Sequence, residues 1–218
     1  MTLATIELCP ADPPRATLIV LHGLGADGTD FIPMCDAMDL SAVGPVHCVM
    51  PRAPERPVTI NNGMRMRAWY DILQMGGGAE DEAGIRDAQV LLEGLISRET
   101  GKGIPHGKIV LAGFSQGGAI ALQTALRQRE RLAGVMALST YLPLSKTLEK
   151  ERAAENSDLP IFMAHGAYDN MIPLDRAARS RDALLALGYA VEWHEYPMAH
   201  SVCPEEIANI AAFLLRIL

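Results

Sequence analysis

Short apolar segments alternate along the chain with amphipathic segments of helical period. Nearly continuous apolar runs of this kind are typical of strands that are buried on both faces of a parallel sheet. The predicted strands are Ala16–Leu21, Val46–Met50, Lys108–Phe114, Leu132–Leu138, Pro160–Ala164 and Ala190–Tyr196.

The segments between and after these strands have the spacing of buried helix faces. In the stretch 82–99, apolar side chains recur every three or four residues, at Ile85, Ala88, Leu92 and Leu95. The predicted helices are Glu82–Glu99, Gln116–Arg129, Leu174–Leu187 and Pro204–Ile217. Strands and helices that alternate in this way predict an α/β fold, with helices on both faces of a mostly parallel central sheet. Because no linker or repeat interrupts the pattern, we expect residues 1–218 to form a single domain.

Two segments are less regular. Arg52–Gly78 is rich in proline, glycine and asparagine and is predicted to form long loops, which in a compact domain are often functional. Ser139–Leu159 lies between two predicted strands and is too short for a cap domain with its own core. Its charged run Glu149–Arg152 is predicted to be a solvated face.

Charge and hydropathy limit the partners and the location. The chain has 19 Lys and Arg against 26 Asp and Glu, a net charge of −7. Such a surface repels phosphate, so we expect neither nucleic acid nor an anionic membrane as a partner. No apolar run approaches the roughly 20 residues that span a bilayer. The segment Met1–Cys9 lacks the pattern of a signal peptide, so we expect a cytoplasmic protein without a stable membrane anchor.

The cysteines and histidines contain no linear metal motif. Cys9, Cys35, Cys48 and Cys203 are scattered, without a CxxC pair, and are expected to be reduced thiols. The dipeptide at 194–195 begins an HExxH pattern, but methionine occupies the position of its second histidine. The sequence therefore predicts no metal and no cofactor.

A GxSxG motif is the strongest chemical signal in the chain. It reads Gly113-Phe114-Ser115-Gln116-Gly117, follows an apolar strand and opens a helical segment. Strand, tight turn and helix form the context in which this motif exposes a nucleophilic serine. A Cβ in place of either glycine would collide with the neighbouring strand or helix. We therefore predict Ser115 as a nucleophile and the N–H of Gln116 as a donor aimed at the same space.

A serine nucleophile needs a base, and the base needs an acid that orients it. In the nucleophile-elbow topology the order along the chain is serine, acid, histidine. Asp169 and His200 fit this order, since each follows the end of a later predicted strand. Parallel strands gather such loop residues at one edge of the sheet. His22 and His165 also stand at strand ends, before glycines, and are expected to make structural hydrogen bonds.

The segment after the strand Ala16–Leu21 has two interpretations. Its glycines at positions 23, 25 and 28 spell GxGxxG, the fingerprint of dinucleotide-binding proteins. In those proteins the next strand ends in an acidic residue, but here it ends in Met-Pro-Arg, and Pro33 disturbs the expected helix. The alternative is an oxyanion loop, in which the N–H of Leu24 donates beside that of Gln116. The oxyanion loop is the favoured interpretation.

Together these motifs resemble the carboxylesterase/phospholipase family of α/β-hydrolases, which includes acyl-protein thioesterases and bacterial type II carboxylesterases. The matching blocks run in the family's order over almost the whole chain: Leu21–Gly28, Pro57–Thr59, Arg67–Asp71, Gly113–Gly118, Ala137–Pro143, His165–Asp169 and His200–Val202. The resemblance implies an α/β-hydrolase fold, a catalytic triad of Ser115, Asp169 and His200, and an oxyanion hole made by Leu24 and Gln116. It also implies that Trp69 lies near the substrate groove, and it is compatible with a homodimer. The chain departs from the family at Ala199, where glycine is usual.

The expected function is that of a serine carboxylesterase that hydrolyses short-to-medium-chain esters, with thioesters and lysophospholipids as open alternatives. Without a cap domain, the active site should be an open groove bordered by Trp69, Met75, Tyr141 and Leu142. Two other classes of function remain: an oxidoreductase that binds a dinucleotide through the GxGxxG segment, and a binding protein on the same fold that has lost catalysis.

Overall fold

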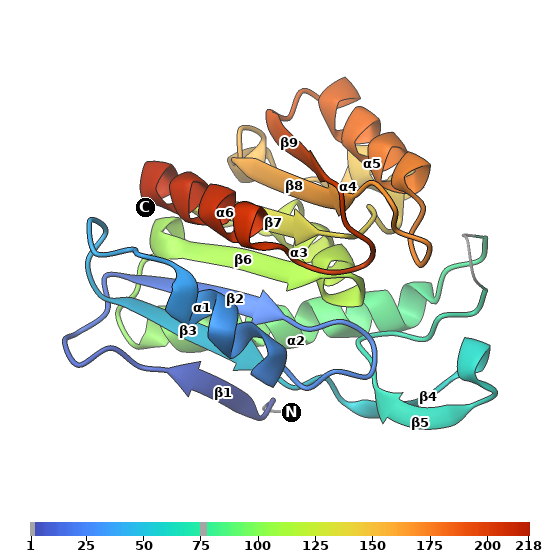
Figure 1. Cartoon of the computed structure of the whole chain (residues 1–218), viewed down its shortest axis with the longest axis horizontal. Coiled ribbons are helices and arrows are strands. Elements are labelled where there is room, and N and C mark those ends of the chain that lie inside the picture. Colours follow the sequence, from blue (N-terminus) through green and yellow to red (C-terminus); the bar gives the residue numbers. More distant parts are fainter. Residues whose placement is uncertain (1–2, 75–77) are drawn as a thin grey trace.

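A twisted seven-stranded sheet runs through the centre of the molecule (Figure 1). The computed structural model describes residues 3–74 and 78–218. The strand order is β1-β3-β2-β6-β7-β8-β9, and all neighbours are parallel except β1, which pairs antiparallel with β3. The strands are β1 (Thr5–Leu8), β2 (Ala16–Leu21), β3 (Val46–Pro51), β6 (Ile109–Phe114), β7 (Gly134–Leu138), β8 (Ile161–Gly166) and β9 (Val191–Tyr196).

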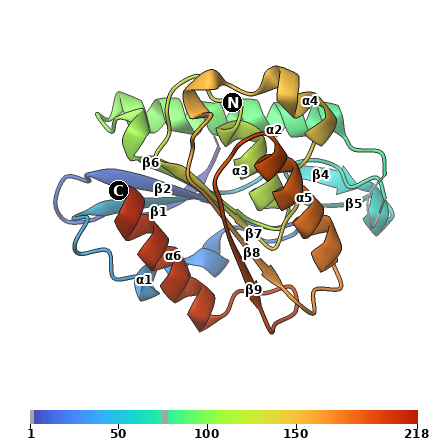
Figure 2. The ribbon, with the colours of Figure 1, turned by 90° about the horizontal axis from the view of Figure 1, so that it is seen from above.

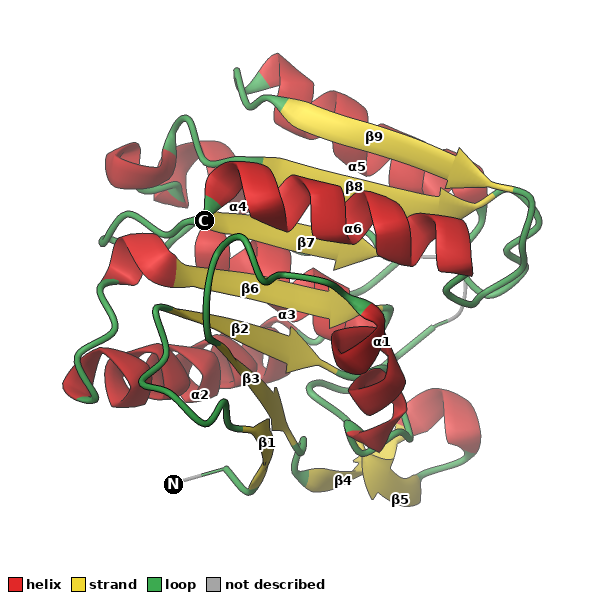
Figure 3. Cartoon of the chain, turned by 60° about the vertical axis from the view of Figure 1, so that its left-hand side comes forward, coloured by secondary structure: helices red, strands yellow, loops and turns green. Residues whose placement is uncertain are grey.

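Helices cover both faces of this sheet (Figure 2). One face carries α1 (Ile32–Ala37) and α6 (Pro204–Ile217), which cross it in front of the strands in Figure 3. The other face carries α2 (Glu82–Gly101), α3 (Gln116–Ala125), α4 (Ser145–Glu151) and α5 (Leu174–Ala186). The sheet is therefore the middle of three layers.

The continuous apolar strands follow from this layering. In β2, Ile19 and Leu21 belong to the core beneath α2 and α3, whereas Leu18 and Val20 belong to the core beneath α1 and α6. Successive side chains of a strand point to opposite faces, so a strand covered on both faces must be apolar at every position. The six strands and four helices predicted from the sequence are all present, and the bounds of α6 and β2 are as predicted.

The sequence prediction omitted several short elements. They are the edge strand β1, the short helices α1 and α4, and a two-stranded antiparallel hairpin of β4 (Glu55–Val58) and β5 (Met64–Arg67). The hairpin corrects the expectation that 52–78 is only loop. Asn62 and Gly63 both have positive φ at its turn, and these are the residue types that tolerate that conformation. Pro57 and the half-buried side chains hid the strands, because they broke the apolar pattern.

The charged run Glu149–Arg152 is not simply a solvated face, which is a second correction. Glu151 ends α4 and pairs with Arg127, two residues beyond α3, at 2.8 Å and with Arg86 of α2 at 2.7 Å. Burial alone would raise the pKa of Glu151, but hydrogen bonds from Arg86, Thr147 and Arg127 lower it to about 2. These ion pairs join α4 to α2 and to the segment that follows α3.

The interval between β7 and β8 contains only α4 and a short 3₁₀ helix, Ala154–Asn156. The fold therefore has no large cap domain over the carboxyl ends of the strands. Within the described residues, no helix has both the length and the apolar character needed to cross a membrane.

One buried carboxyl group stands out at the first turn of α6. Glu206 is fully buried, and neither of its carboxyl oxygens has a hydrogen-bond partner of normal geometry among the described residues. Burial raises the pKa of Glu206 to about 8, and the nearby Cys203 N–H offsets only part of this effect. The folded protein therefore holds a proton at neutral pH that the unfolded chain releases.

We predict that Glu206→Gln stabilises the protein at neutral and alkaline pH. The wild type loses free energy of unfolding as pH rises from about 4.5, where the unfolded Glu ionises, to the folded pKa of about 8. The variant lacks this loss, so it should be more stable by up to about 3 kcal/mol at pH 7, since each pKa unit is worth about 1.4 kcal/mol. Urea unfolding between pH 4 and pH 9 measures the difference. The exposed neighbour serves as control: Glu205→Gln should follow the wild-type profile, and a Glu206→Gln profile that also follows it would contradict the account.

Candidate active site

Ser115 stands on the tight turn between β6 and α3. Its backbone has φ 54° and ψ −120°, a conformation that non-glycine residues rarely adopt. A Cβ on Gly113 would overlap the backbone of Gly117, and a Cβ on Gly117 would overlap the carbonyl of Leu21 at the end of β2. The turn can therefore form only because both flanking positions are glycine, as the sequence predicted. It raises Ser115 above the carboxyl end of the sheet.

Asp169 and His200 come together from the loops after β8 and β9. The Nδ1 atom of His200 lies 2.6 Å from Oδ2 of Asp169, so the ring donates its Nδ1–H to that oxygen. The other carboxylate oxygen accepts the N–H groups of Met171 at 2.8 Å and Ile172 at 2.9 Å. These contacts fix the position of the acid and leave Nε2 of His200 free to act as a base.

Two alternatives to this pair occupy other roles. Nε2 of His165 lies 2.8 Å from the carbonyl of Ile172 and 3.4 Å from Asp169, and burial lowers the pKa of His165, so it supports the acid's loop as a neutral ring. Asp175, the next acid along the chain, is exposed and pairs with Arg179 at 2.5 Å. Asp169 is thus the carboxylate that contacts His200.

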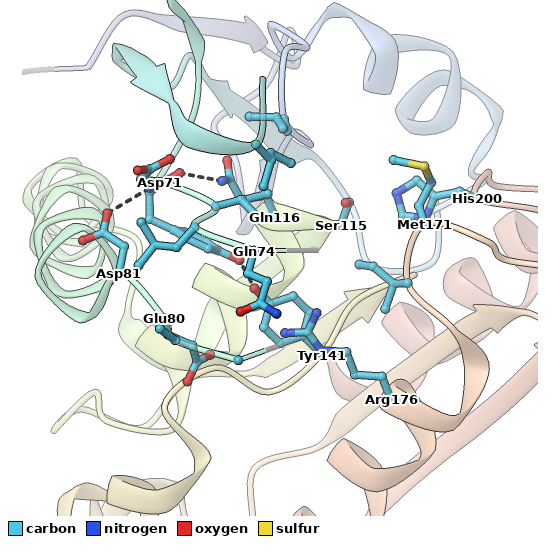
Figure 4. Close-up of a pocket in the computed structure, with 18 residues that line it drawn as sticks. Asp71, Gln74, Glu80, Asp81, Ser115, Gln116, Tyr141, Met171, Arg176 and His200 are labelled. Carbon is cyan, nitrogen blue, oxygen red and sulfur yellow. Dashed lines mark hydrogen bonds between the residues drawn. The ribbon is translucent and has the colours of Figure 1, made fainter. Parts of the chain in front are cut away.

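Ser115 and His200 line the same pocket and face one another in Figure 4. The ring of Phe114, next to the serine, packs on the His200 ring with centroids 4.6 Å apart. Among the described hydrogen bonds, none joins Oγ of Ser115 to His200. Such bonds are often long in a free active site and shorten when substrate binds.

The loop after β2 lies beside the serine. Leu24 borders the pocket together with Ser115 and Gln116. No described group accepts the Leu24 N–H, and the N–H of Gln116, in the first turn of α3, has no partner within the helix. The glycines of this loop do not open a helix directly, since a 3₁₀ turn at Thr29–Phe31 comes before α1. This geometry favours the oxyanion interpretation over the dinucleotide one.

Hydrogen bonds of His22 and Trp69 hold the loop that carries Leu24. Nε2 of His22 accepts the N–H of Ala53 at 3.0 Å, so its Nδ1–H donates to the carbonyl of Gly23 at 2.7 Å. Burial lowers the pKa of His22, which keeps the ring neutral. The indole N–H of Trp69 donates to the carbonyl of His22 at 2.9 Å. The structural role expected for His22 is confirmed.

Trp69 does not border the groove, which corrects the expectation from the resemblance. Its side chain is fully buried and belongs to the core. The Gln116 side chain accepts the Trp69 N–H at 2.8 Å and donates to the carbonyl of Tyr70 at 2.7 Å. Trp69 therefore contributes to the site indirectly, because its hydrogen bonds join the serine turn to the loop of Leu24.

The pocket in front of Ser115 has a mainly apolar wall and contains about 760 Å³ of space, including its open mouth. Tyr141 lines it, and its hydroxyl meets that of Tyr70 at 2.7 Å, while Arg176 stacks on the Tyr141 ring at 3.4 Å (Figure 4). Leu142 lines an adjoining hollow instead, and Met75 lies outside the described residues. The other apolar lining residues are Leu24, Ile60, Ile72, Leu73, Ala79, Met171 and Ile172.

Thr140 supports the serine and was not singled out from the sequence. Its hydroxyl donates to the carbonyl of Ser115 at 2.6 Å, and its methyl group would lie only 2.7 Å from a Cβ on Gly118. The bond satisfies a carbonyl at the strained turn. Only its place in the block Ala137–Pro143 pointed to this segment, since an isolated threonine after a strand carries no specific signal.

Comparisons with known proteins agree with this geometry. The sequence profile of the phospholipase/carboxylesterase family matches residues 3–218. The chain belongs to the phospholipase/carboxylesterase family. Among its relatives, the acyl-protein thioesterase 1 of Mycosarcoma maydis is 41% identical over 94% of this chain and 92% of its own length. That of Neurospora crassa is 42% identical over 91% of this chain and 85% of its own length.

Solved structures show the same fold. SOBER1 of Arabidopsis thaliana superimposes with a TM-score of 0.88 at 28% identity, over 93% of this chain and 98% of its own. Acyl-protein thioesterase 2 of Zea mays gives 0.87 at 27% identity, over 98% of both chains. The fold is that of the α/β-hydrolases, and membership of the phospholipase/carboxylesterase family makes the protein an enzyme of the serine-hydrolase class.

We predict that Asp169→Asn lowers kcat for ester hydrolysis by about 10⁴, because an amide at this position favours the wrong tautomer of His200. Steady-state kinetics with a chromogenic ester measure the loss. Asp175→Asn is the matched control and should remain near wild type. If Asp175→Asn lost turnover while Asp169→Asn kept near-normal turnover, the assignment of Asp169 as the acid would be wrong.

Proposed function

We propose that the protein is a carboxylesterase that cleaves esters or thioesters of short-to-medium acyl chains through a covalent intermediate on Ser115. The observation that carries the proposal is the position of Ser115. It stands on a strained turn at the mouth of an apolar pocket, facing a histidine whose far nitrogen contacts a buried carboxylate. A strained serine with these neighbours is the arrangement required of an activated nucleophile.

In the first half of the reaction, Oγ of Ser115 attacks the carbonyl carbon of the substrate. Nε2 of His200 takes the hydroxyl proton, and the Asp169 carboxylate stabilises the imidazolium that forms. Collapse of the tetrahedral intermediate expels the alcohol or thiol, which receives its proton from His200. The acyl group then remains on the serine.

The negative charge that develops on the carbonyl oxygen needs donors. The N–H groups of Leu24 and Gln116 donate to no described group, and both residues line the pocket of Ser115, so we assign them to the oxyanion hole. Each such donor is worth about 3 kcal/mol of transition-state stabilisation. His22 and Trp69 hold the loop of Leu24 and thereby set the direction of one donor.

The second half of the reaction reverses these roles. Water enters the site left by the alcohol or thiol, and His200 removes its proton as it attacks the acyl-enzyme. A second hollow also reaches Ser115 and is lined by Phe31, Phe114 and Val202. It offers space for the leaving group, while the pocket lined by Leu24, Ile72 and Tyr141 takes the acyl chain.

The substrate class follows from the pocket's walls. An apolar groove favours an acyl chain, and each buried methylene contributes about 0.8 kcal/mol until the groove ends. The Tyr70 and Tyr141 hydroxyl pair and Arg176 stand where the pocket meets the adjoining hollow. Thioesters are a natural second substrate, because relatives at 41% and 42% identity are named acyl-protein thioesterases.

We predict that Ser115→Ala lowers ester hydrolysis by about 10⁶, because the triad acts as a unit and loses its nucleophile. The assay measures release of p-nitrophenol from p-nitrophenyl butyrate, with a thioester of the same acyl group in parallel. Exposed Ser97 of α2, which lines neither pocket at Ser115, provides a serine control: Ser97→Ala should retain activity. Substantial turnover in Ser115→Ala would exclude the proposed mechanism.

We predict that Tyr141→Ala shifts the preferred acyl chain to longer esters. Removal of the ring joins the pocket to the hollow beyond it, so each further buried methylene gains about fourfold in kcat/KM. The measurement is a p-nitrophenyl ester series from acetate to palmitate below the solubility limit. Tyr141→Phe keeps the ring and should keep the wild-type optimum. If the optimum of Tyr141→Ala does not move, the acyl chain does not occupy this pocket.

A further inference from the structure

A second cluster of reactive side chains lies at the opposite end of the sheet from Ser115. His47 is near the start of β3 and is paired in register with Thr17 near the start of β2, whereas Ser115 follows the end of β6. Glu7 of the edge strand β1 and Cys9, just beyond it, lie against His47. The mechanism at Ser115 uses none of these groups.

The three side chains direct one ligand atom each at a common point. The Nε2 atom of His47 lies 3.0 Å from Oε2 of Glu7 and 3.5 Å from Sγ of Cys9, and all three ligand atoms lie within 4.8 Å of one another. In a tetrahedral zinc site, bonds of about 2.0 Å to nitrogen and about 2.3 Å to sulfur place those two atoms roughly 3.5 Å apart. The nitrogen–sulfur distance already has that value, and the 3.0 Å between Nε2 of His47 and Oε2 of Glu7 is close to the roughly 3.3 Å that two bonds of about 2.0 Å would give.

A buried carboxylate holds the histidine in the orientation that such a site needs. Nδ1 of His47 lies 2.9 Å from Oε2 of Glu99, which is fully buried in α2 and also accepts the Thr17 hydroxyl at 3.3 Å. A carboxylate on the far nitrogen is the usual partner of a metal-binding histidine, since it fixes the tautomer and makes the near nitrogen more basic. With Nδ1 as the donor, Nε2 presents its lone pair to Glu7 and Cys9.

The charges around the cluster allow a divalent cation to enter. Glu7 and Glu99 are balanced by Arg98 and Lys102, which pair with them at 2.8 to 3.8 Å. A metal ion that binds here displaces the Cys9 thiol proton. One proton leaves as two positive charges arrive, so the cluster gains a single positive charge, which the Glu7 and Glu99 carboxylates face.

We propose that Glu7, Cys9 and His47 bind a single divalent ion of the zinc class, with water in the fourth position. A thiolate, an imidazole and a carboxylate together favour Zn²⁺ or Co²⁺ over Mg²⁺ and Ca²⁺, which prefer oxygen ligands alone. The ion ties the edge strand β1 to β3 and, through Glu99, to α2. The ion lies at the opposite end of the sheet from Ser115 and takes no part in the chemistry there. The sequence contains no linear motif for it, because the ligands come from two strands that meet only in the fold.

The test uses the full chain, stripped of metal with EDTA and titrated with Co²⁺ while its absorption spectrum is recorded. We expect one Co²⁺ per chain, with the near-ultraviolet band of a thiolate–cobalt bond and its loss on addition of Zn²⁺. Cys9→Ser should abolish the band and weaken binding by at least about tenfold. Cys203→Ser, a thiol outside the cluster, should keep both.

A second variant tests whether Glu7 is a ligand and guards against a loss of binding through misfolding. Glu7→Gln keeps the shape of the side chain and should weaken Co²⁺ binding while the thiolate–cobalt band persists at saturation. Absence of the thiolate band in the wild type, or a band unchanged in Cys9→Ser, would overturn the proposal. Ester hydrolysis measured on the same EDTA-treated sample tests the function at Ser115 separately, because the two sites share no residue.

Discussion

The close approach of α3 to the end of β2 is the constraint on which the active site depends. The backbone at Gly117 touches the carbonyl oxygens of Leu21 and His22, a contact that leaves no room for a Cβ. Because the helix starts so near the sheet, the chain must reverse at Ser115 in a conformation that costs about 1–3 kcal/mol. The surrounding core maintains this strain, and the same contact brings the serine turn against the loop of Leu24. One backbone approach thus positions both the proposed nucleophile and the proposed oxyanion donors.

The rest of the site is gathered by the parallel sheet. The loops after β8 and β9 meet because their strands are neighbours, and a Cβ on Gly166 would overlap the carbonyl of Met198 in the loop that carries His200. Ala199 has no positive φ, so alanine is accommodated there without backbone strain where the family usually has glycine. Hydrogen bonds from the backbone then hold Asp169, because the N–H groups of Met171 and Ile172 both donate to its Oδ1. The His200 ring is therefore already oriented before a substrate binds.

The sequence predicted the framework because burial on two faces leaves a strong signal. Runs such as Ala16–Leu21 and the helix Pro204–Ile217 appear with the predicted bounds. Short or half-exposed elements such as β1 leave only a weak signal in the sequence. Trp69 shows a different limit of sequence-based prediction. The family resemblance implied a groove residue, but only the fold reveals that the Trp69 indole is buried and donates to the carbonyl of His22. Contacts such as Thr140 to the Ser115 carbonyl depend on strand neighbours, which no local pattern encodes.

The central claim is that Ser115 is activated by His200 and becomes acylated. Reaction with a fluorophosphonate probe, followed by mass spectrometry of the peptide that contains residue 115, tests it most directly, since the probe forms a stable bond only with an activated serine. The account predicts stoichiometric labelling of Ser115 in the wild type, and labelling that is slower by orders of magnitude in His200→Ala with an unchanged fold. Labelling of another residue, or equal rates in both proteins, would contradict the claim. Binding of NAD(P) without labelling would instead restore the dinucleotide interpretation of the loop after β2.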